Sequence, residues 1–384
     1  MKFGSRRTIL GLMGTVIVCV LGVAFASGQT GPAPKPQMAE EVFKNIPALK
    51  GIPVDEFMDT MGMFAAALSM NCIDCHTEDS SGKWENFAKE TTIKQTARRM
   101  ILMVNNLNRN NFAGTRKVTC WTCHRGDQTP ELVPNLTVQY GLAPDDPSKI
   151  FIPPQPLPGT PTVDQVFEKY VQALGGAQRL ASITSFTAKG TYEGYDTDHL
   201  KVPVEIYAKA PDQRTTIVHA HWGDSVRTYD GRAGWIAGYE KPVPLVTLTG
   251  GNLDGASLES IISFPARLRQ AFSEWRVTTT LIDNKLVNVL QGIRAGRPPV
   301  NLYFDQSGLL VRMLRYNDTL VGAVPVQIDY EDYREVSGVK VAFKWTETWT
   351  NNQATTQLSE LQPNVPIDVA RFARPAPAKP AQPK

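Results

Sequence analysis

The chain has 384 residues and a formal net charge of only +3 at pH 7, with 20% charged and 42% hydrophobic residues. This length is typical of a chain with two domains. A nearly neutral chain without a long charge run or a basic stripe gives no support for a nucleic-acid partner.

The first 26 residues have the pattern of a secretory signal. Arg6 and Arg7 precede an apolar run from Ile9 to Phe25, and Ala24-Phe25-Ala26 resembles a cleavage site. We therefore expect export to the periplasm or to the outer face of the cytoplasmic membrane. The apolar run is close to the ~20 residues that a bilayer span needs, so an uncleaved N-terminal anchor is the alternative.

Proline-rich stretches divide the rest of the chain. Nine prolines lie between Pro130 and Pro161, a composition that favours an extended, semi-rigid connector. The predicted division is, in chain order, a signal peptide (1–26), a tether (27–37), a helical domain (38–135), a proline-rich linker (136–161), a β-rich domain (162–372) and a disordered tail (373–384).

The first domain is predicted to contain two amphipathic helices. Apolar residues recur at helical spacing from Val54 to Leu68, and again from Ile93 to Leu107. The two stripes consist of Val54, Phe57, Met61, Phe64 and Leu68, and of Ile93, Ala97, Met100, Val104 and Leu107.

Each predicted helix is followed by the same motif, Cys-x-x-Cys-His, at 72–76 and at 120–124. This is the attachment motif of c-type haem, in which two thiols add across the vinyl groups and the adjacent histidine ligates the iron. We therefore expect two covalently attached haem c groups, whose apolar bulk would also help so short a region to form a core. The covalent attachment residues are Cys72, Cys75, Cys120 and Cys123, and the proximal iron ligands are His76 and His124.

Each iron then needs a sixth ligand or keeps an open position, and this separates an electron carrier from a site that binds substrate or gas. Of the ten methionines, seven lie between residues 38 and 103. We predict Met61 as the sixth ligand opposite His76 and Met100 as the one opposite His124. Met58 and Met103 are the alternates, and methionine as ordinary core filler is the competing interpretation.

Three arginines lie close in sequence to the expected haem positions, namely Arg98, Arg99 and Arg125. Haem propionates need charge neutralisation in a partly buried site, so these side chains are candidates for propionate contacts. As ordinary surface arginines they would need no such partner, and both interpretations stay open.

The stretch from about residue 40 to residue 135 resembles the photosynthetic reaction centre cytochrome c subunit. The similarity is greatest at Ala97-Arg98-Arg99-Met100 and at Thr119-Cys-x-Thr-Cys-His-Arg-Gly126. Members of that family typically carry four haems, with the sixth ligand on the helix before each motif, whereas this chain keeps two motifs. The resemblance implies electron transfer with a donor and an acceptor protein, such as a membrane reaction centre or a respiratory complex.

The second domain is predicted to be an antiparallel β-sheet, curved or partly closed into a half-barrel, with helices on one side. An amphipathic helix at Val163–Ala173 precedes it, and a helical insert is expected around Leu258–Phe272. The predicted strands are 204–210, 215–221, 235–236, 277–282, 286–290, 300–304, 309–316, 326–330 and 339–345. The fold class is therefore α+β with more than one domain.

Turn residues of the second domain, such as Asp305-x-Ser-Gly308, resemble those of the LolA-like lipoprotein carriers. That resemblance implies a cavity for acyl chains, and hence a lipid or lipoprotein ligand of this domain. The leading hypothesis for the whole chain is an exported dihaem electron carrier rather than an enzyme. The alternatives are a dihaem peroxidase-like enzyme or redox sensor with one open haem site, and a lipid- or lipoprotein-binding module that carries haems.

Overall fold

The computed structural model describes residues 34–80, 83–134, 136, 141, 150–238 and 243–378. The predicted signal peptide, residues 27–33 of the tether, residues 137–140 and 142–149 of the linker and residues 379–384 of the tail lie outside these ranges. Over the ranges given, no helix has both the length and the apolar character needed to cross a bilayer.

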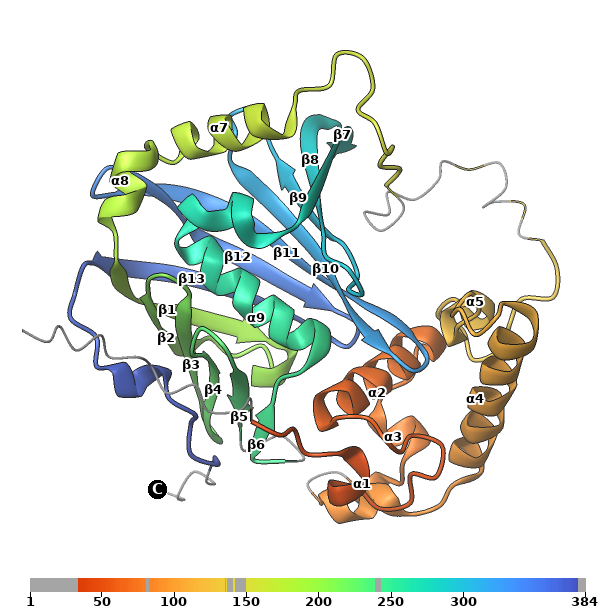
Figure 1. Cartoon of the computed structure of the whole chain (residues 1–384). Coiled ribbons are helices and arrows are strands. Elements are labelled where there is room, and N and C mark those ends of the chain that lie inside the picture. Colours follow the sequence, from red (N-terminus) through yellow and green to blue (C-terminus); the bar gives the residue numbers. More distant parts are fainter. Residues whose placement is uncertain are drawn as a thin grey trace, which may run out of the picture. The chain divides into compact units, whose positions relative to one another are not determined.

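The first folded region is built from short helices around two longer ones (Figure 1). In chain order they are α1 (Ala39–Val42), α2 (Val54–Leu68), α3 (Cys72–Cys75), η1 (Glu78–Ser80), η2 (Trp84–Ala88), α4 (Thr92–Asn111) and α5 (Cys120–His124). The two predicted amphipathic helices are confirmed as α2 and α4, and each haem motif forms a single helical turn.

The face that α4 buries differs from the predicted stripe. Ile101, Val104 and Asn108 are its buried residues, whereas Ile93 and Met100 are exposed. Apolar side chains occur on two sides of this helix, so periodicity identified the helix but could not decide which side packs on the protein.

The second region is one antiparallel sheet of 13 strands in the described part of the chain. The strand order is β6-β5-β4-β3-β2-β1-β13-β12-β11-β10-β9-β8-β7, so β6 and β7 are the edges and the sheet is not closed. The strands are β1 (Ser185–Gly194), β2 (Val202–Lys209), β3 (Gln213–Ala220), β4 (Gly223–Tyr229), β5 (Gly234–Ala237), β6 (Leu245–Thr247), β7 (Glu274–Ile282), β8 (Lys285–Ile293), β9 (Val300–Phe304), β10 (Leu310–Thr319), β11 (Gly322–Val336), β12 (Val339–Trp349) and β13 (Asn352–Pro363).

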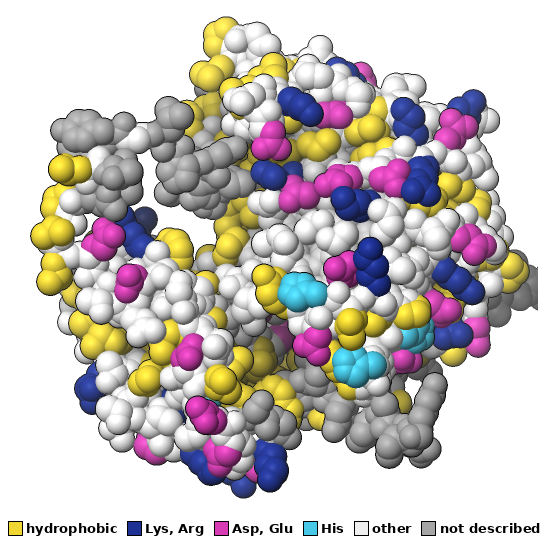
Figure 2. Space-filling view, turned by 180° about the vertical axis from the view of Figure 1, so that it is seen from behind, with side chains coloured by type: hydrophobic (Ala, Val, Ile, Leu, Met, Phe, Trp, Pro, Cys, Tyr) yellow, Lys and Arg dark blue, Asp and Glu magenta, His cyan; other side chains and the backbone are white. Residues whose placement is uncertain are grey.

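Helices cover one face of this curved sheet, as predicted (Figure 1). They are α7 (Val163–Ala173), α8 (Ala177–Ser182), α9 (Gly250–Ser263) and η5 (Pro265–Ala271), while η4 (Tyr195–Thr197) lies between β1 and β2, and η6 (Val369–Phe372) follows β13. The opposite face carries acidic and basic side chains side by side (Figure 2), including the cross-strand pairs Arg312–Asp329 at 2.5 Å and Lys344–Glu331 at 2.7 Å. The α+β fold class predicted from the sequence is confirmed.

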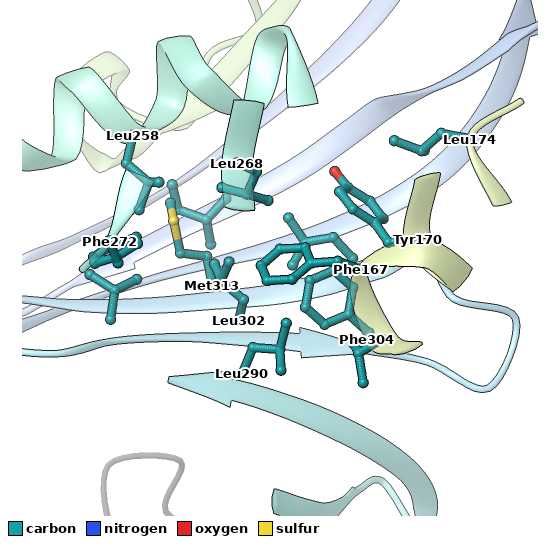
Figure 3. Packing of buried hydrophobic residues seen from close by; sticks show 14 of the residues in the cluster. Phe167, Tyr170, Leu174, Leu258, Leu268, Phe272, Leu290, Leu302, Phe304 and Met313 are labelled. Atoms are coloured by element: carbon teal, nitrogen blue, oxygen red, sulfur yellow. The ribbon is translucent and has the colours of Figure 1, made fainter. Parts of the chain in front are cut away.

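The main hydrophobic core lies between the covering helices and strands β8 to β11 (Figure 3). Phe167 and Tyr170 of α7 pack on Phe304 of β9, with ring centroids 6.4 and 5.1 Å apart. Met313 of β10 is fully buried in this core, and its thioether is therefore committed to packing.

Helix α2 packs against the hairpin formed by β10 and β11. Met63 packs closely on Gly322, where a Cβ atom would lie 2.5 Å from the Met63 Cε atom. Val321 and Val324 belong to the same buried cluster as Met63. The helical region and the sheet thus share a core, and the domain boundaries at 135 and 162 stay predictions.

Polar contacts reinforce this packing. The buried Asp55 carboxylate accepts hydrogen bonds from the Thr249 backbone N–H (2.5 Å) and hydroxyl (2.8 Å). Asp59 accepts from the side-chain amides of Asn252 (2.7 Å) and Asn317 (3.1 Å). Burial raises the pKa of both carboxyl groups, that of Asp59 to about 6.

Candidate functional site

The first haem motif is a one-turn helix that is capped by side chains of its own segment. The Asn71 side chain accepts hydrogen bonds from the backbone N–H groups of Ile73 (3.0 Å) and Asp74 (3.2 Å), and the Asp74 carboxylate accepts from the Asn71 N–H (2.7 Å). This reciprocal cap satisfies the free donors at a helix start, so four residues suffice to form a turn. In a helical turn, Cys72 and Cys75 lie on the same side, as two bonds to one porphyrin require.

The His76 imidazole has a defined orientation. Its Nδ1 atom lies 3.0 Å from the Phe87 carbonyl oxygen, which can only accept, so Nδ1 carries the proton and the Nε2 lone pair is left free. Burial, more than any other cause, lowers the pKa of His76 and favours the neutral ring. A neutral imidazole whose second nitrogen is held by a carbonyl is the usual arrangement of a histidine that ligates a metal.

The N-terminus of α4 is tied to this first motif. The Thr91 hydroxyl donates to the Cys75 carbonyl oxygen (2.8 Å) and also accepts from the Lys94 N–H, which caps α4. The Lys94 ammonium donates to the Phe87 carbonyl oxygen at 2.8 Å, the same atom that orients His76. Burial lowers the pKa of Lys94.

The second motif repeats the design with other residues. The Thr119 N–H donates to the Thr122 hydroxyl oxygen (3.0 Å), and the Thr122 N–H donates to the Thr119 hydroxyl oxygen (3.3 Å). Arg125 and Gly126 then take positive φ values of 51° and 91°, which turn the chain back on itself. The Asp127 carbonyl oxygen thereby lies 3.0 Å from His124 Nδ1, so this imidazole also keeps Nε2 free.

Both motifs are attached to the C-terminal end of α2. The first follows directly from Ser69, whose left-handed conformation (φ 49°) ends the helix. The second is held by hydrogen bonds from the Gly126 N–H to the Ala67 carbonyl oxygen (3.0 Å) and from the Ser69 hydroxyl to the Gly126 carbonyl oxygen (2.6 Å). The end of one helix therefore positions both Cys-x-x-Cys-His motifs.

Asn108, near the end of α4, holds the chain that enters the second motif. Its buried side chain donates to the Val118 carbonyl oxygen (2.8 Å) and accepts from the N–H groups of Lys117 (3.0 Å) and Val118 (2.9 Å). Because Thr91 holds the other end of α4 at the first motif, this helix fixes the two motifs relative to each other.

The residues present fit covalent haem. Among the described residues the cysteines Cys72, Cys75, Cys120 and Cys123 are all free thiols, and each pair is followed by a histidine with a free Nε2. Burial raises the pKa of Cys75, and that of Cys120 to about 11. Large apolar side chains are exposed on the same elements, an amount of apolar surface that indicates a binding role; they are Ile73, Trp84, Ile93, Met100, Leu102, Met103, Leu107, Phe112 and Trp121.

The predicted sixth ligands lie on the two long helices. Met58 and Met61 are half-buried on α2 next to the cluster that Met63 joins, whereas Met100 and Met103 are exposed on α4. Met70, which was not a candidate, lies with its Sδ atom 3.9 Å from the Cys75 Sγ atom.

The three candidate arginines have different surroundings. Arg98 forms two hydrogen bonds to the Glu90 carboxylate (2.8 and 2.9 Å) and also donates to Asn45. Arg99 and Arg125 are exposed, and Arg99 donates to the Thr96 hydroxyl at 2.9 Å. Phe87 and Asp127 were not anticipated, because they act through backbone carbonyl groups that their side chains do not reveal.

Residues 24–139 match the family described as "Photosynthetic reaction centre cytochrome C subunit". The photosynthetic reaction center cytochrome c subunit of Roseobacter denitrificans is 32% identical over 110 residues, covering 26% of this chain and 29% of the relative. That of Thermochromatium tepidum is 34% identical over 110 residues, covering 28% of this chain and 25% of the relative. The resemblance inferred from the sequence is confirmed, and it spans less than a third of these relatives' length.

Solved structures similar to this chain match its β-rich part. A LolA superfamily protein from Nitrosomonas europaea aligns with 14% identity and a TM-score of 0.37, covering 56% of this chain and 98% of that protein. A putative outer membrane lipoprotein-sorting protein domain from Vibrio parahaemolyticus aligns with 10% identity and the same TM-score, covering 54% of this chain and 94% of that domain.

Proposed function

We propose that this protein is an exported dihaem c-type cytochrome that passes electrons between a donor and an acceptor protein. The observation that carries the proposal is the pair of capped one-turn helices, each with two free cysteines and a histidine whose Nδ1 is held by a backbone carbonyl. Bound haem would supply one-electron chemistry at its iron. The similarity of residues 24–139 to reaction centre cytochrome subunits supports the same role.

The residues divide the work of holding two haems. The thiols of Cys72 and Cys75 would hold the first haem through two thioether bonds, and the addition of a thiol to a vinyl group needs no oxidant. Cys120 and Cys123 would hold the second haem in the same way. The Nε2 atoms of His76 and His124 are the proximal ligands, oriented by the Phe87 and Asp127 carbonyl groups.

We further propose Met61 and Met100 as the sixth ligands, with Met58 and Met103 as alternates. A thioether ligand raises the reduction potential and leaves no open position for substrate, which favours an electron carrier over a peroxidase-like enzyme. Arg98 is engaged by Glu90, so Arg99 and Arg125 are better placed to reach propionates. The exposed apolar side chains of α4 would shield a bound porphyrin from water.

The cellular setting follows from covalent haem attachment and from the leader sequence. We propose a location in the periplasm or on the outer face of the cytoplasmic membrane, with a membrane reaction centre or a respiratory complex among the partners. The matched relatives are reaction centre subunits, and the shared segment covers only 29% and 25% of their length.

Haem stoichiometry tests this proposal. The protein is produced with a c-type maturation system, extracted with acidified acetone and assayed for haem that stays with the chain. We expect two haems per chain, and one after either Cys72→Ala/Cys75→Ala or Cys120→Ala/Cys123→Ala. Loss of all haem on extraction would exclude a c-type cytochrome. Carbon monoxide binding by the wild-type reduced protein would contradict the two thioether ligands and favour an open-site enzyme or sensor.

A further inference from the structure

The hairpin that joins β10 and β11 turns on two apolar residues, Leu320 and Val321. Two-residue hairpin turns ordinarily contain Gly, Asn or Asp, which accept the turn conformation and face water. Val321 is nevertheless only 2% exposed, and Leu320 is half-buried. The Thr319 hydroxyl supports this turn, since it donates to the Gly322 carbonyl oxygen (2.6 Å) and accepts from the Val321 N–H (3.3 Å). A buried apolar turn indicates that the tip of the hairpin packs against another element.

That element is the segment that enters the second Cys-x-x-Cys-His motif. Arg116 forms an ion pair of 2.8 Å with Asp318, which lies next to the turn. A Cβ atom on Gly322 would lie 3.4 Å from the Cβ atom of Thr119, the residue whose side chain caps α5. The hairpin therefore touches the chain at two places just before Cys120.

Cys120 itself is buried together with the tip of the hairpin. Its exposed fraction is 9%, and it belongs to the same apolar cluster as Val321 and Val324, which are each 2% exposed. At the first motif, by contrast, Cys72 is exposed and Cys75 is half-buried. The two attachment sites thus differ in what surrounds their cysteines, and a hairpin of the sheet contributes to the difference.

We propose that the tip of the β10–β11 hairpin, residues 319–324, is an apolar wall of the second haem site and raises the electron affinity of the haem held there. This inference rests on the proposed function, because it concerns a haem joined to Cys120 and Cys123. Methyl and methylene groups beside the Cys120 thioether would keep water away from that edge of the porphyrin. Low polarity disfavours the extra positive charge of ferric iron, so the wall would favour the ferrous state.

The hairpin lies outside the part of the chain that matches the reaction centre cytochrome family. Asp318 follows Arg116 by 202 residues, whereas the match covers residues 24–139. The β-rich region would therefore take part in a redox site whose attachment motif belongs to another region of the chain.

Single-haem forms of the full-length protein separate the two sites. Cys72→Ala/Cys75→Ala retains only the second attachment site, and Cys120→Ala/Cys123→Ala retains only the first. In each form, Leu320→Glu, Leu320→Lys and Leu320→Gln are compared by redox titration followed by visible absorption. Leu320 suits this test because it is half-buried against the cluster, so a long charged side chain can keep its end in water.

Opposite charges at position 320 should shift the second haem in opposite directions. Relative to Leu320→Gln, Leu320→Glu should favour the ferric state and Leu320→Lys the ferrous state. We expect the ferric/ferrous equilibrium constants of the two charged variants to differ at least tenfold, which is about 59 mV for a one-electron couple. A loss of packing alone would move both variants in the same direction. The first haem should differ less than threefold between them.

Ala323 provides the matched control on the same hairpin. Its side chain is exposed on the opposite face of β11 from Gly322 and Val324. Ala323→Glu and Ala323→Lys therefore carry the same charges on the solvent side, and either haem should differ less than threefold between them.

A substitution of nearly constant volume repeats the test without added charge. Val321→Thr places a hydroxyl in the cluster that holds Cys120, whereas Val339→Thr makes the same change at a residue of the main core that is 4% exposed. Val321→Thr should favour the ferric state of the second haem at least twofold, and Val339→Thr should leave it unchanged.

Three results would each overturn the inference while the dihaem function stands. They are shifts of the second haem with the same sign in Leu320→Glu and Leu320→Lys, equal responses of the two haems, and equal effects of Val321→Thr and Val339→Thr. A wild-type protein without covalent haem would overturn the proposed function and this inference together.

Discussion

His76 and Lys94 donate hydrogen bonds to the same atom, the carbonyl oxygen of Phe87, at 3.0 and 2.8 Å. The second site lacks this feature in the described structure: the Asp127 carbonyl oxygen that holds His124 accepts no lysine side chain there. A carbonyl that also binds a cation accepts less strongly from Nδ1, so the imidazole would donate less electron density to the iron of a haem held there. The nearby positive charge would also disfavour oxidised iron. Both effects would raise the potential of a haem at the first site relative to one at the second.

Replacement of Lys94 by glutamine should therefore lower the midpoint potential of the haem at His76. Loss of about 1 kcal/mol of charge interaction corresponds to roughly 40 mV for a one-electron couple. Redox titration followed by visible absorption measures both haems in one sample. We expect the potential of the haem at His124 to stay unchanged.

Lys89 provides the matched control for this experiment. Its ammonium pairs with Asp79 and not with the Phe87 carbonyl oxygen, and its side chain is half exposed. Lys89→Gln removes the same charge five residues away and should shift the potential much less. Equal shifts in the two variants would show that Phe87 does not transmit the effect.

Asn108 should be required for the second haem site. Asn108→Ala removes three hydrogen bonds and leaves the Val118 carbonyl group and two backbone N–H groups without their partner. Each unsatisfied buried group costs about 1–3 kcal/mol, so we expect at least about 2 kcal/mol of destabilisation. Haem content should fall at the second motif and stay complete at the first, as measured by mass spectrometry of haem peptides.

Asn111→Ala is the control on the same helix. Asn111 is exposed and donates one long hydrogen bond of 3.2 Å to the Leu107 carbonyl oxygen. This variant should bind two haems and unfold at nearly the wild-type temperature. A similar loss of haem in Asn108→Ala and Asn111→Ala would mean that α4 as a whole, and not the Asn108 contacts, positions the motif.

Replacement of either proposed sixth ligand should leave one coordination position free on one of the two irons. Met61→Ala and Met100→Ala are each expected to yield one high-spin haem that binds carbon monoxide when reduced. Met58→Ala and Met103→Ala should remain low-spin, and carbon monoxide binding by these variants instead would reassign the ligands.

Met63→Ala separates ligation from packing. Met63 is buried against the β10–β11 hairpin, so its truncation should cost about 2–5 kcal/mol in unfolding free energy. Because this side chain is committed to the core, both haems should remain low-spin in the folded variant. A new carbon monoxide complex in Met63→Ala would show that spectral changes in the other variants report a disturbed fold.

The sequence predicted those parts of the fold that local patterns encode. The helices at 54–68 and 163–173 coincide with α2 and α7, and the nine predicted strands correspond to strands of the sheet. Strands β1, β4, β6 and β13 were missed. In β1 and β13, threonine, glycine and glutamine replace most aliphatic residues, and their extended form depends on pairing with each other across 160 or more residues.

In the candidate site, too, the sequence reveals the local motifs but not the contacts that form only in the folded chain. The sequence names candidate haem-attachment residues because the Cys-x-x-Cys-His spacing is visible in it, whereas the atoms that orient the two histidines are backbone carbonyl groups. The charged cluster under α9 was also missed, because Arg214, Arg227 and Glu347 lie on three separate strands and meet Glu259 only in the folded sheet. Sequence separation conceals such clusters whatever their residue types.

The contact between α2 and the sheet should make stability depend on pH. Burial raises the pKa of Asp59 from 3.8 to about 6, so between these values the folded protein binds more protons than the unfolded chain. The contribution of neutral Asp59 to the stability of the folded protein is therefore complete below about pH 4 and is lost as the pH rises through 6. A pKa shift of about two units corresponds to a change in the free energy of unfolding on the order of 2–3 kcal/mol.

Asp59→Asn should remove this dependence. The asparagine oxygen can still accept from Asn252 and Asn317, and no charge needs to be buried. We expect the variant to be more stable than the wild type at pH 7.5, by on the order of 2 kcal/mol, and equally stable at pH 4. Urea unfolding at the two pH values measures this, with Asp283→Asn in the exposed β7–β8 turn as the control for a lost surface carboxylate. If the stabilities of the wild type and of Asp59→Asn increase equally between pH 4 and 7.5, the prediction is wrong. Asp59 would then ionise in the folded protein without a cost in unfolding free energy.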